Sequence, residues 1–210
     1  MAGERAVLFD FGGVLLRQDW DEYDAFCERN GLPARALRRA LYGTEEWRAL
    51  QTGRISDRTV WRAAAIASLA EHCGDRAEGL FEEWYSRPTR LHQPNIELAN
   101  ALAAAGVRVG LLSNAAPDLE TRITEQFGVE VDWTDRVISG LVGLAKPDPA
   151  IYRLAAERIG LPEPACFFID DIGENVEAAR GVGMLAHHFQ GDYEALHADL
   201  RAAGYEWEQA

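Results

Sequence analysis

The sequence has few cysteines and lacks the pattern of a secreted, disulfide-bonded protein. Its 210 residues contain three cysteines, Cys27, Cys73 and Cys166, which lie far apart and form no Cys-x-x-Cys pair. An odd number of scattered cysteines is typical of free thiols in a reducing compartment. We therefore expect a cytoplasmic protein.

Long apolar runs are also missing. No apolar stretch reaches the length of about 18 residues that a membrane-spanning helix needs. Asp10 interrupts the apolar stretch near the N-terminus, so that stretch does not fit the pattern of a signal peptide. We expect this chain to have no membrane partner.

Basic residues are in the minority. Lysine and arginine together number 21 against 34 aspartates and glutamates, which gives a formal net charge of -13 and an isoelectric point of about 4.8. Such a chain repels nucleic acid, so nucleic acid is not an expected partner either. An acidic protein can still bind a phosphate group where a metal ion and a few local donors hold it.

The chain divides into two regions by pattern. Hydrophobic residues make up 48% of it, enough for one core domain with a small inserted cap. Residues 17–89 have helical periodicity, interrupted by glycines into about four helices, with no strand pattern. We predict that residues 1–16 and 90–210 form the core domain and that residues 17–89 form a helical cap.

Strands and helices alternate through the predicted core. Short apolar strands are expected at 6–9, 107–112, 136–139, 166–169 and 184–187. Helices are expected at 95–105, 118–127 and 150–160, and another from residue 175. This alternation predicts an α/β fold with a Rossmann-like, doubly wound parallel sheet.

Polar side chains follow directly on three of these strands. Asp10, Ser113 and the pair Asp170-Asp171 each come where an apolar strand ends. Ligands of doubly wound sheets bind at the carboxyl ends of the strands, so these side chains should face one crevice. Carboxylates that converge repel each other unless a cation lies between them, and Mg2+ prefers oxygen ligands.

Donors for an anion lie near the same edge. Ser113 and Asn114 stand where a strand meets a helix, and Lys146 precedes a predicted helix and could neutralise negative charge. A carboxylate, a metal, a lysine and amide donors together fit phosphoryl transfer through an aspartyl-phosphate.

Four segments resemble the motifs of one family, in the family's order. They are FDFGGVLL, LLSN, KPDPAIY and FFIDDIGENVEAARGVGM, with a helical insert after the first. The chain resembles the haloacid dehalogenase-like hydrolase superfamily, and within it the phosphatase-like branch that has a small helical cap. The likeness covers nearly the whole chain.

The resemblance implies roles for the matching residues. Asp10 would be the nucleophile and a Mg2+ ligand, together with the Gly12 backbone carbonyl and Asp171. Asp170 would be a further ligand or an outer partner, and Asn175 takes the place of the family's second acid at that motif. The phosphate would be held by Ser113, the Asn114 backbone amide and Lys146, so the expected catalytic residues are Asp10, Ser113 and Lys146.

One position departs from the family's phosphatases. They have a second aspartate two residues after the nucleophile, which protonates the leaving group and then activates water, whereas this chain has Gly12. General acid–base catalysis contributes about 10²- to 10⁴-fold in rate. Three explanations remain open: the enzyme is slow, Asp19 or a cap residue substitutes for the missing acid, or the leaving group needs no proton.

Three functions remain open from the sequence. The first is a Mg2+-dependent phosphatase acting on a small phosphorylated metabolite such as a sugar phosphate. The second is a dehalogenase, which in this superfamily lacks the second aspartate and works without metal, although the Asp170-Asp171 pair argues against it. The third is a binding protein that kept the scaffold and lost turnover through Gly12. We expect a monomer or a homodimer.

Overall fold

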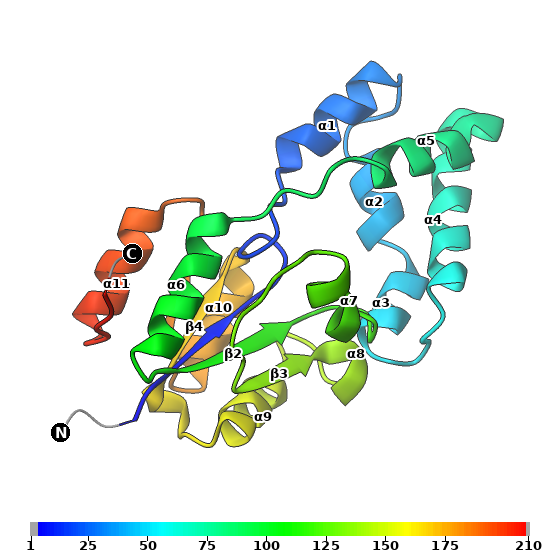
Figure 1. Ribbon diagram of the computed structural model, residues 1–210. Coiled ribbons are helices and arrows are strands. Elements are labelled where there is room, and N and C mark those ends of the chain that lie inside the picture. Colours follow the sequence, from blue (N-terminus) through cyan, green and yellow to red (C-terminus); the bar gives the residue numbers. More distant parts are fainter. Residues whose placement is uncertain (1–3, 209–210) are drawn as a thin grey trace.

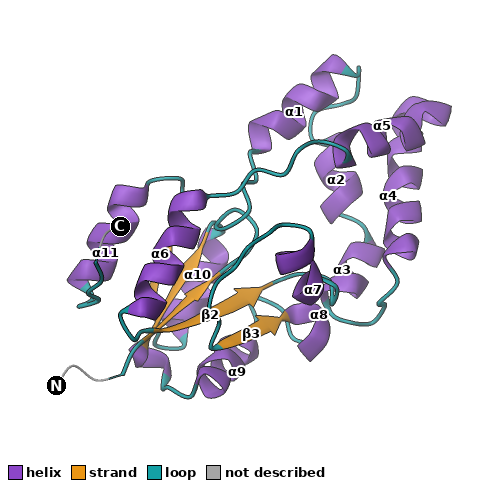
Figure 2. Ribbon diagram, viewed as in Figure 1, coloured by secondary structure: helices purple, strands orange, loops and turns teal. Residues whose placement is uncertain are grey.

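The computed structural model describes residues 4–208, which contain a five-stranded parallel sheet with helices on both faces. The strand order is β3-β2-β1-β4-β5, so the first strand along the chain is central. Figure 2 shows the strands in orange between the flanking helices. The strands are β1 (Ala6–Phe9), β2 (Arg108–Ser113), β3 (Asp135–Ile138), β4 (Cys166–Asp170) and β5 (Leu185–His188). The predicted α/β class and parallel sheet are confirmed.

Alternate side chains of β1 enter two separate apolar layers, because successive residues of a strand point to opposite faces. Val7 and Phe9 pack in one cluster with residues of α6 (Gln93–Ala104) and α11 (Tyr193–Ala202). Ala6 and Leu8 pack in the other with residues of α9 (Pro149–Ile159) and α10 (Gly173–Gly181). All four β1 side chains are buried, so the sheet is covered on both faces, as parallel sheets are.

The segment after β1 forms a separate group of helices, visible at the upper right of Figure 1. They pack around a hydrophobic cluster of their own, in which Trp61 is buried and its indole Nε1 donates to the Leu41 carbonyl at 2.8 Å. A 3-10 turn, Gly74–Arg76, joins the last two helices. The helices are α1 (Trp20–Arg29), α2 (Ala36–Tyr42), α3 (Glu45–Gln51), α4 (Arg58–Cys73) and α5 (Ala77–Tyr85).

Two linker segments connect the helical group to the sheet. They lie side by side, because the Arg17 amide donates to the Arg90 carbonyl at 2.9 Å and Leu16 forms an isolated antiparallel β-bridge with Leu91. The helical group therefore leaves the sheet near the carboxyl end of β1. This connection places α1–α5 above the edge where ligands of such sheets bind.

Element boundaries differ from the prediction at several points. Ser113 and Asp170 are the last residues of β2 and β4, rather than the first residues after them. The predicted helix 118–127 is shorter, as α7 (Leu119–Glu125). Two helices occur where none was predicted, α8 (Ser139–Val142) and α11. A single turn such as α8 is too short for periodicity to reveal.

Between residues 4 and 208, no helix combines the length and the apolar character that crossing a bilayer would need.

Candidate active site

Three neighbouring strands bring polar side chains to one edge of the sheet. Asp10 directly follows β1, and its backbone amide donates to the Ile169 carbonyl of β4 at 2.9 Å. Phe9 pairs in register with Leu111 of β2 and with Ile169. The strand ends that carry Asp10, Ser113 and Asp170 are thus adjacent, and all three side chains are buried.

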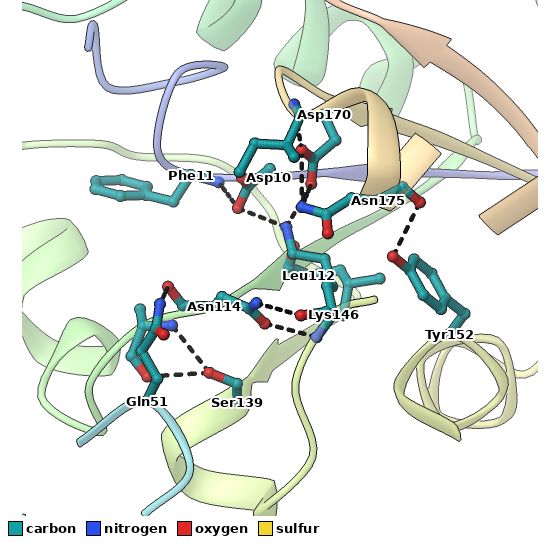
Figure 3. Close-up of polar contacts among 12 residues, drawn as sticks. Asp10, Phe11, Gln51, Leu112, Asn114, Ser139, Lys146, Tyr152, Asp170 and Asn175 are labelled. Carbon is teal, nitrogen blue, oxygen red and sulfur yellow. Dashed lines mark hydrogen bonds and ion pairs between the residues drawn. The ribbon is translucent and has the colours of Figure 1, made fainter. Parts of the chain in front are cut away.

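Lys146, the only lysine in the chain, enters the same site from the loop between α8 and α9. Its side chain is 1% exposed. The ammonium nitrogen Nζ lies 3.0 Å from Asp10 Oδ1 and 2.6 Å from Asp170 Oδ2, and it donates to the Leu112 carbonyl at 3.1 Å (Figure 3). The lysine thereby joins two carboxylates that would otherwise repel each other.

The environment of Asp10 works against its ionised form. The pKa of this carboxyl is raised to about 7, and burial is the largest cause. The charges of Asp170 and Asp171 also raise this pKa, while Lys146 and a hydrogen bond from Ser113 lower it. One lysine therefore does not fully offset the burial of this carboxylate, and a cation at the site would favour ionisation. The Phe11 amide donates to Asp10 Oδ1 at 2.7 Å, which fixes the orientation of the carboxylate.

Asp170 is surrounded by donors. Besides Lys146, it accepts from the Ile172 backbone amide at 2.8 Å. The Asn175 side-chain nitrogen lies 3.1 Å from both of its carboxylate oxygens (Figure 3). Since its oxygens already have partners within the protein, Asp170 is suited to holding Lys146 in place. Asn175, which stands where the family has a second acid, supports Asp170 here.

Asp171 is the more accessible member of the acidic pair. Its pKa is raised to about 6, first by burial and then by the neighbouring charge of Asp170. A side chain at Gly13 would put its Cβ atom 2.2 Å from Asp171 Cγ, and Gly13 also has a φ of +76°. Only glycine therefore lets the turn after Asp10 approach this carboxylate so closely.

These three carboxylates form a group that could hold a metal ion. Each of Asp10, Asp170 and Asp171 offers one oxygen, and these oxygens all lie within 4.8 Å of one another. The donor set consists of hard oxygen atoms, which suits Mg2+. The pKa values of Asp10 and Asp171 are raised mainly by burial, and a cation beside them would favour their ionised forms.

Asn114 has a contact that sequence reasoning missed. Its side-chain nitrogen donates to the Lys146 carbonyl at 2.8 Å, and its side-chain oxygen accepts from the Lys146 amide at 2.8 Å. The two bonds fix the backbone that carries the lysine (Figure 3). Gln51 of α3 donates to the Asn114 carbonyl at 3.2 Å, so the helical group contacts this loop directly. No sequence pattern signals these contacts, which join residues far apart along the chain.

A cavity of about 310 Å³ opens beside these residues. Gly12, Ser113 and Asn114 are among the residues that line it. Other lining residues come from the helical group and from the segment around α7, and many of them are aromatic. These include Tyr23, Tyr42, Trp47, Trp84, Tyr85 and Phe127.

Asp19, considered above as a substitute for the missing second aspartate, also lines this cavity. Its carboxylate accepts from the Asp21 backbone amide at 3.0 Å and caps the N-terminus of α1. The side chain is therefore engaged in starting a helix.

A family model for haloacid dehalogenase-like hydrolases matches residues 4–183. The chain belongs to this family. The match spans the sheet edge described above, the helical group and β4, so the resemblance predicted from the four motifs is confirmed and the protein is a hydrolase by family.

Similar proteins include two named as phosphatases. Phosphatase MT3486 of Mycobacterium tuberculosis is 31% identical over 189 residues, which cover 87% of this chain and 85% of that protein. A phosphoglycolate phosphatase of Xylella fastidiosa is 30% identical over 191 residues, 86% of this chain and 77% of its own length. A haloacid dehalogenase-like enzyme of Bacteroides thetaiotaomicron, solved as a magnesium complex, superimposes with a TM-score of 0.66. The superposition covers 93% of this chain and 98% of that enzyme, at 20% sequence identity. At this identity the likeness supports the fold only.

Proposed function

We propose that this protein is a Mg2+-dependent phosphatase of a small phosphorylated metabolite, with sugar phosphates as the first class to test. The observation that carries the proposal is the buried contact of Lys146 with both Asp10 and Asp170, beside a third carboxylate. A lysine in this position balances negative charge on a transferring phosphoryl group. The relatives named as phosphatases support the same chemistry.

We assign the metal ligands among the acidic residues. Asp10, the Gly12 backbone carbonyl and Asp171 would hold Mg2+, while Asp170 mainly positions Lys146 because its oxygens have protein partners. Bound Mg2+ would supply positive charge next to the phosphate and keep Asp10 ionised. The rest of the chemistry belongs to the residues of this chain.

The reaction would proceed in two displacements. An oxygen of Asp10 attacks phosphorus, forming an aspartyl-phosphate while the ester P–O bond breaks and the leaving group departs as an oxyanion that takes its proton from water. The Ser113 hydroxyl, the Asn114 backbone amide and Lys146 hold the phosphate oxygens during this step. Water then cleaves the aspartyl-phosphate, which releases inorganic phosphate and restores Asp10.

The helical group would act as a cap over this reaction. We propose that residues 17–89 close the cavity and exclude bulk water, while residues 1–16 and 90–210 carry the chemistry. The aromatic walls would contact the leaving group and select it by shape. The cysteines Cys27, Cys73 and Cys166 are free thiols, which fits the proposed cytoplasmic location.

The activity is tested with a panel of phosphorylated metabolites and one aryl phosphate. We expect phosphate release in Mg2+ and its loss in EDTA, because without the cation about half of Asp10 is protonated at pH 7 and the positive charge next to the phosphate is missing. Chloride release from a haloacid in EDTA would indicate the dehalogenase instead. Binding of Mg2+ and of a phosphate analogue with no product from any substrate would indicate a binding protein.

Mg2+ binding should weaken in mild acid. In the metal-free protein Asp10 and Asp171 have pKa values of about 7 and about 6, so protons compete with the cation as the pH falls through this range. We expect the Kd, measured by titration calorimetry, to be at least about tenfold higher at pH 6 than at pH 8. Calorimetry in buffers of different ionisation enthalpy should also detect proton release. A Kd independent of pH would contradict this coupling.

A further inference from the structure

The space beside Gly12 is filled by the amide of Gln18. A Cβ atom built on Gly12 would lie 3.3 Å from Gln18 Nε2 and 3.5 Å from both the carbonyl carbon and Oε1 of that side chain. Gln18 is half-buried and lines the cavity together with Gly12. A neutral amide thus stands next to the position from which a carboxylate at residue 12 would extend.

The carboxylates that line the same cavity are all engaged elsewhere. Asp19 caps α1 through the Asp21 amide. Glu22 forms ion pairs with Arg87 at 2.6 Å and Arg90 at 2.8 Å. Asp19 or Glu22 could turn toward the phosphate only by giving up these contacts.

Asp118, the third of these carboxylates, is held in the same way. It forms ion pairs with Arg58 at 3.3 Å and Arg122 at 3.7 Å. The Gln18 amide therefore occupies the side of Gly12 on which a carboxylate at residue 12 would stand.

The structure assigns to Gln18 the positioning of the water that attacks the aspartyl-phosphate. This inference rests on the proposed phosphatase activity and deepens it. An amide oxygen accepts a hydrogen bond from water and so orients it, as glutamine does in some phosphate-hydrolysing enzymes, but it does not take up the proton.

In the second displacement, all bonds and protons are accounted for without a general base. The water oxygen forms a bond to phosphorus while the bond from phosphorus to the Asp10 oxygen breaks. One proton stays on the attacking oxygen and the other passes to a non-bridging phosphate oxygen. The products are the Asp10 carboxylate and dihydrogen phosphate, so no external acid or base is consumed.

This assignment separates the two chemical steps. Gln18 acts on water in the second step and offers no acidic proton to the leaving group in the first. The wild-type enzyme should therefore prefer esters whose leaving group departs as a stable anion, such as aryl phosphates, over alkyl phosphates.

The test follows single and multiple turnovers of an aryl phosphate by Gln18→Leu and Gln18→Ala. Both variants should release the first equivalent of aryl alcohol at the wild-type rate. Steady-state turnover should then fall by about 100-fold, the order of loss expected when a reactant is mispositioned. The phosphorylated protein should accumulate, detected by intact mass spectrometry after acid quenching and removed by hydroxylamine. The matched control is Gln93→Leu, an exposed glutamine at the start of α6 that does not line the cavity, which should leave both phases unchanged.

The outcomes separate this inference from the proposed function. A wild-type enzyme that neither becomes phosphorylated nor turns over any panel substrate defeats the phosphatase proposal itself. An active wild-type enzyme with Gln18 variants unchanged in both phases, or equally slowed in both, overturns only the assignment to Gln18.

A carboxylate introduced at residue 12 gives a second test. Because the new Cβ atom would lie 3.3 Å from the Gln18 amide, the end of the Gln18 side chain must move by a few tenths of an ångström to admit Gly12→Asp. Gly12→Asp should raise turnover of an alkyl phosphate by about 100-fold, since a carboxylate can protonate the leaving group and activate the water. Gln18→Ala should then cost the Gly12→Asp variant much less than it costs the wild type, because the new carboxylate acts on the water directly. An equal loss in both backgrounds would contradict the inference.

Discussion

Asp10→Asn is expected to lower kcat by about 10⁴-fold or more on every substrate that the wild-type enzyme hydrolyses. The amide cannot form the bond to phosphorus, and loss of a nucleophile removes the covalent route altogether. Such a fall corresponds to about 5.5 kcal/mol of activation free energy. Phosphate release is the measurement, and no phosphorylated protein should be trapped. Residual turnover within tenfold of wild type would exclude Asp10 as the nucleophile.

The same variant should fold. The pKa of Asp10 is raised above its unfolded value, so the metal-free wild type is destabilised as the pH rises from about 4, and the full cost is present above about 7. Asparagine has no charge to bury, so in EDTA at pH 8 the Tm of Asp10→Asn should not be lower than that of wild type. Asp192→Asn is the matched control, because Asp192 is exposed and caps α11, and asparagine caps equally well.

Lys146→Met is expected to lower kcat by about 10³-fold or more, because the charge that balances the phosphoryl group is lost. It should also destabilise the metal-free protein by about 3 to 5 kcal/mol, since Asp10 and Asp170 are left buried without their shared partner. Denaturant unfolding in EDTA measures this second effect. Wild-type stability together with wild-type activity would contradict both roles.

A double variant separates the two roles of the lysine. Lys146→Met combined with Asp170→Asn removes both charges of the 2.6 Å pair. It should recover part of the lost stability, because no unpaired Asp170 charge remains, but none of the lost activity. Recovery of activity would mean that the lysine acts only by neutralising Asp170.

The single lysine also provides a direct spectroscopic readout. Protein that contains ¹⁵N-labelled lysine should give one side-chain signal. This signal reports on the site because Lys146 is the only lysine in the sequence. Addition of Mg2+ and then of inorganic phosphate should shift this signal in wild type. Absence of any shift at saturating Mg2+ and phosphate would place both ligands away from Lys146.

Much of this site could be predicted without coordinates. The run AVLF is apolar enough for a buried strand, and a carboxylate that follows it at Asp10 has to lie at the strand end. The same reasoning located Ser113 and the acidic pair. The small errors lay at element boundaries, where Ser113 and Asp170 proved to be the last residues of their strands.

The division of roles within the acidic pair was harder to predict. The resemblance pointed to Asp171 as the metal ligand but left Asp170 as either a further ligand or an outer partner, because the two aspartates are adjacent and chemically identical. The fold distinguishes them, because β4 pairs with β1 and places Asp170 beside Lys146, whereas Asp171 lies against the Gly13 turn.

The contacts of Asn114 and Gln18 also depended on the fold. The Asn114 side chain binds the backbone of Lys146, and the Gln18 amide fills the space beside Gly12. Both contacts depend on how the loops that carry these residues pack at the edge of the sheet.

The sequence by itself determined the fold class, the family and which side chains stand at the strand ends, because hydrophobic period, element order and motif spacing are local properties of the chain. The tertiary structure alone decided which carboxylate oxygens meet Lys146, which member of the acidic pair is more accessible and which side chain lies beside Gly12. The physical reason is that burial, charge and hydrogen-bond distance are set by strand register and loop packing between residues distant in sequence.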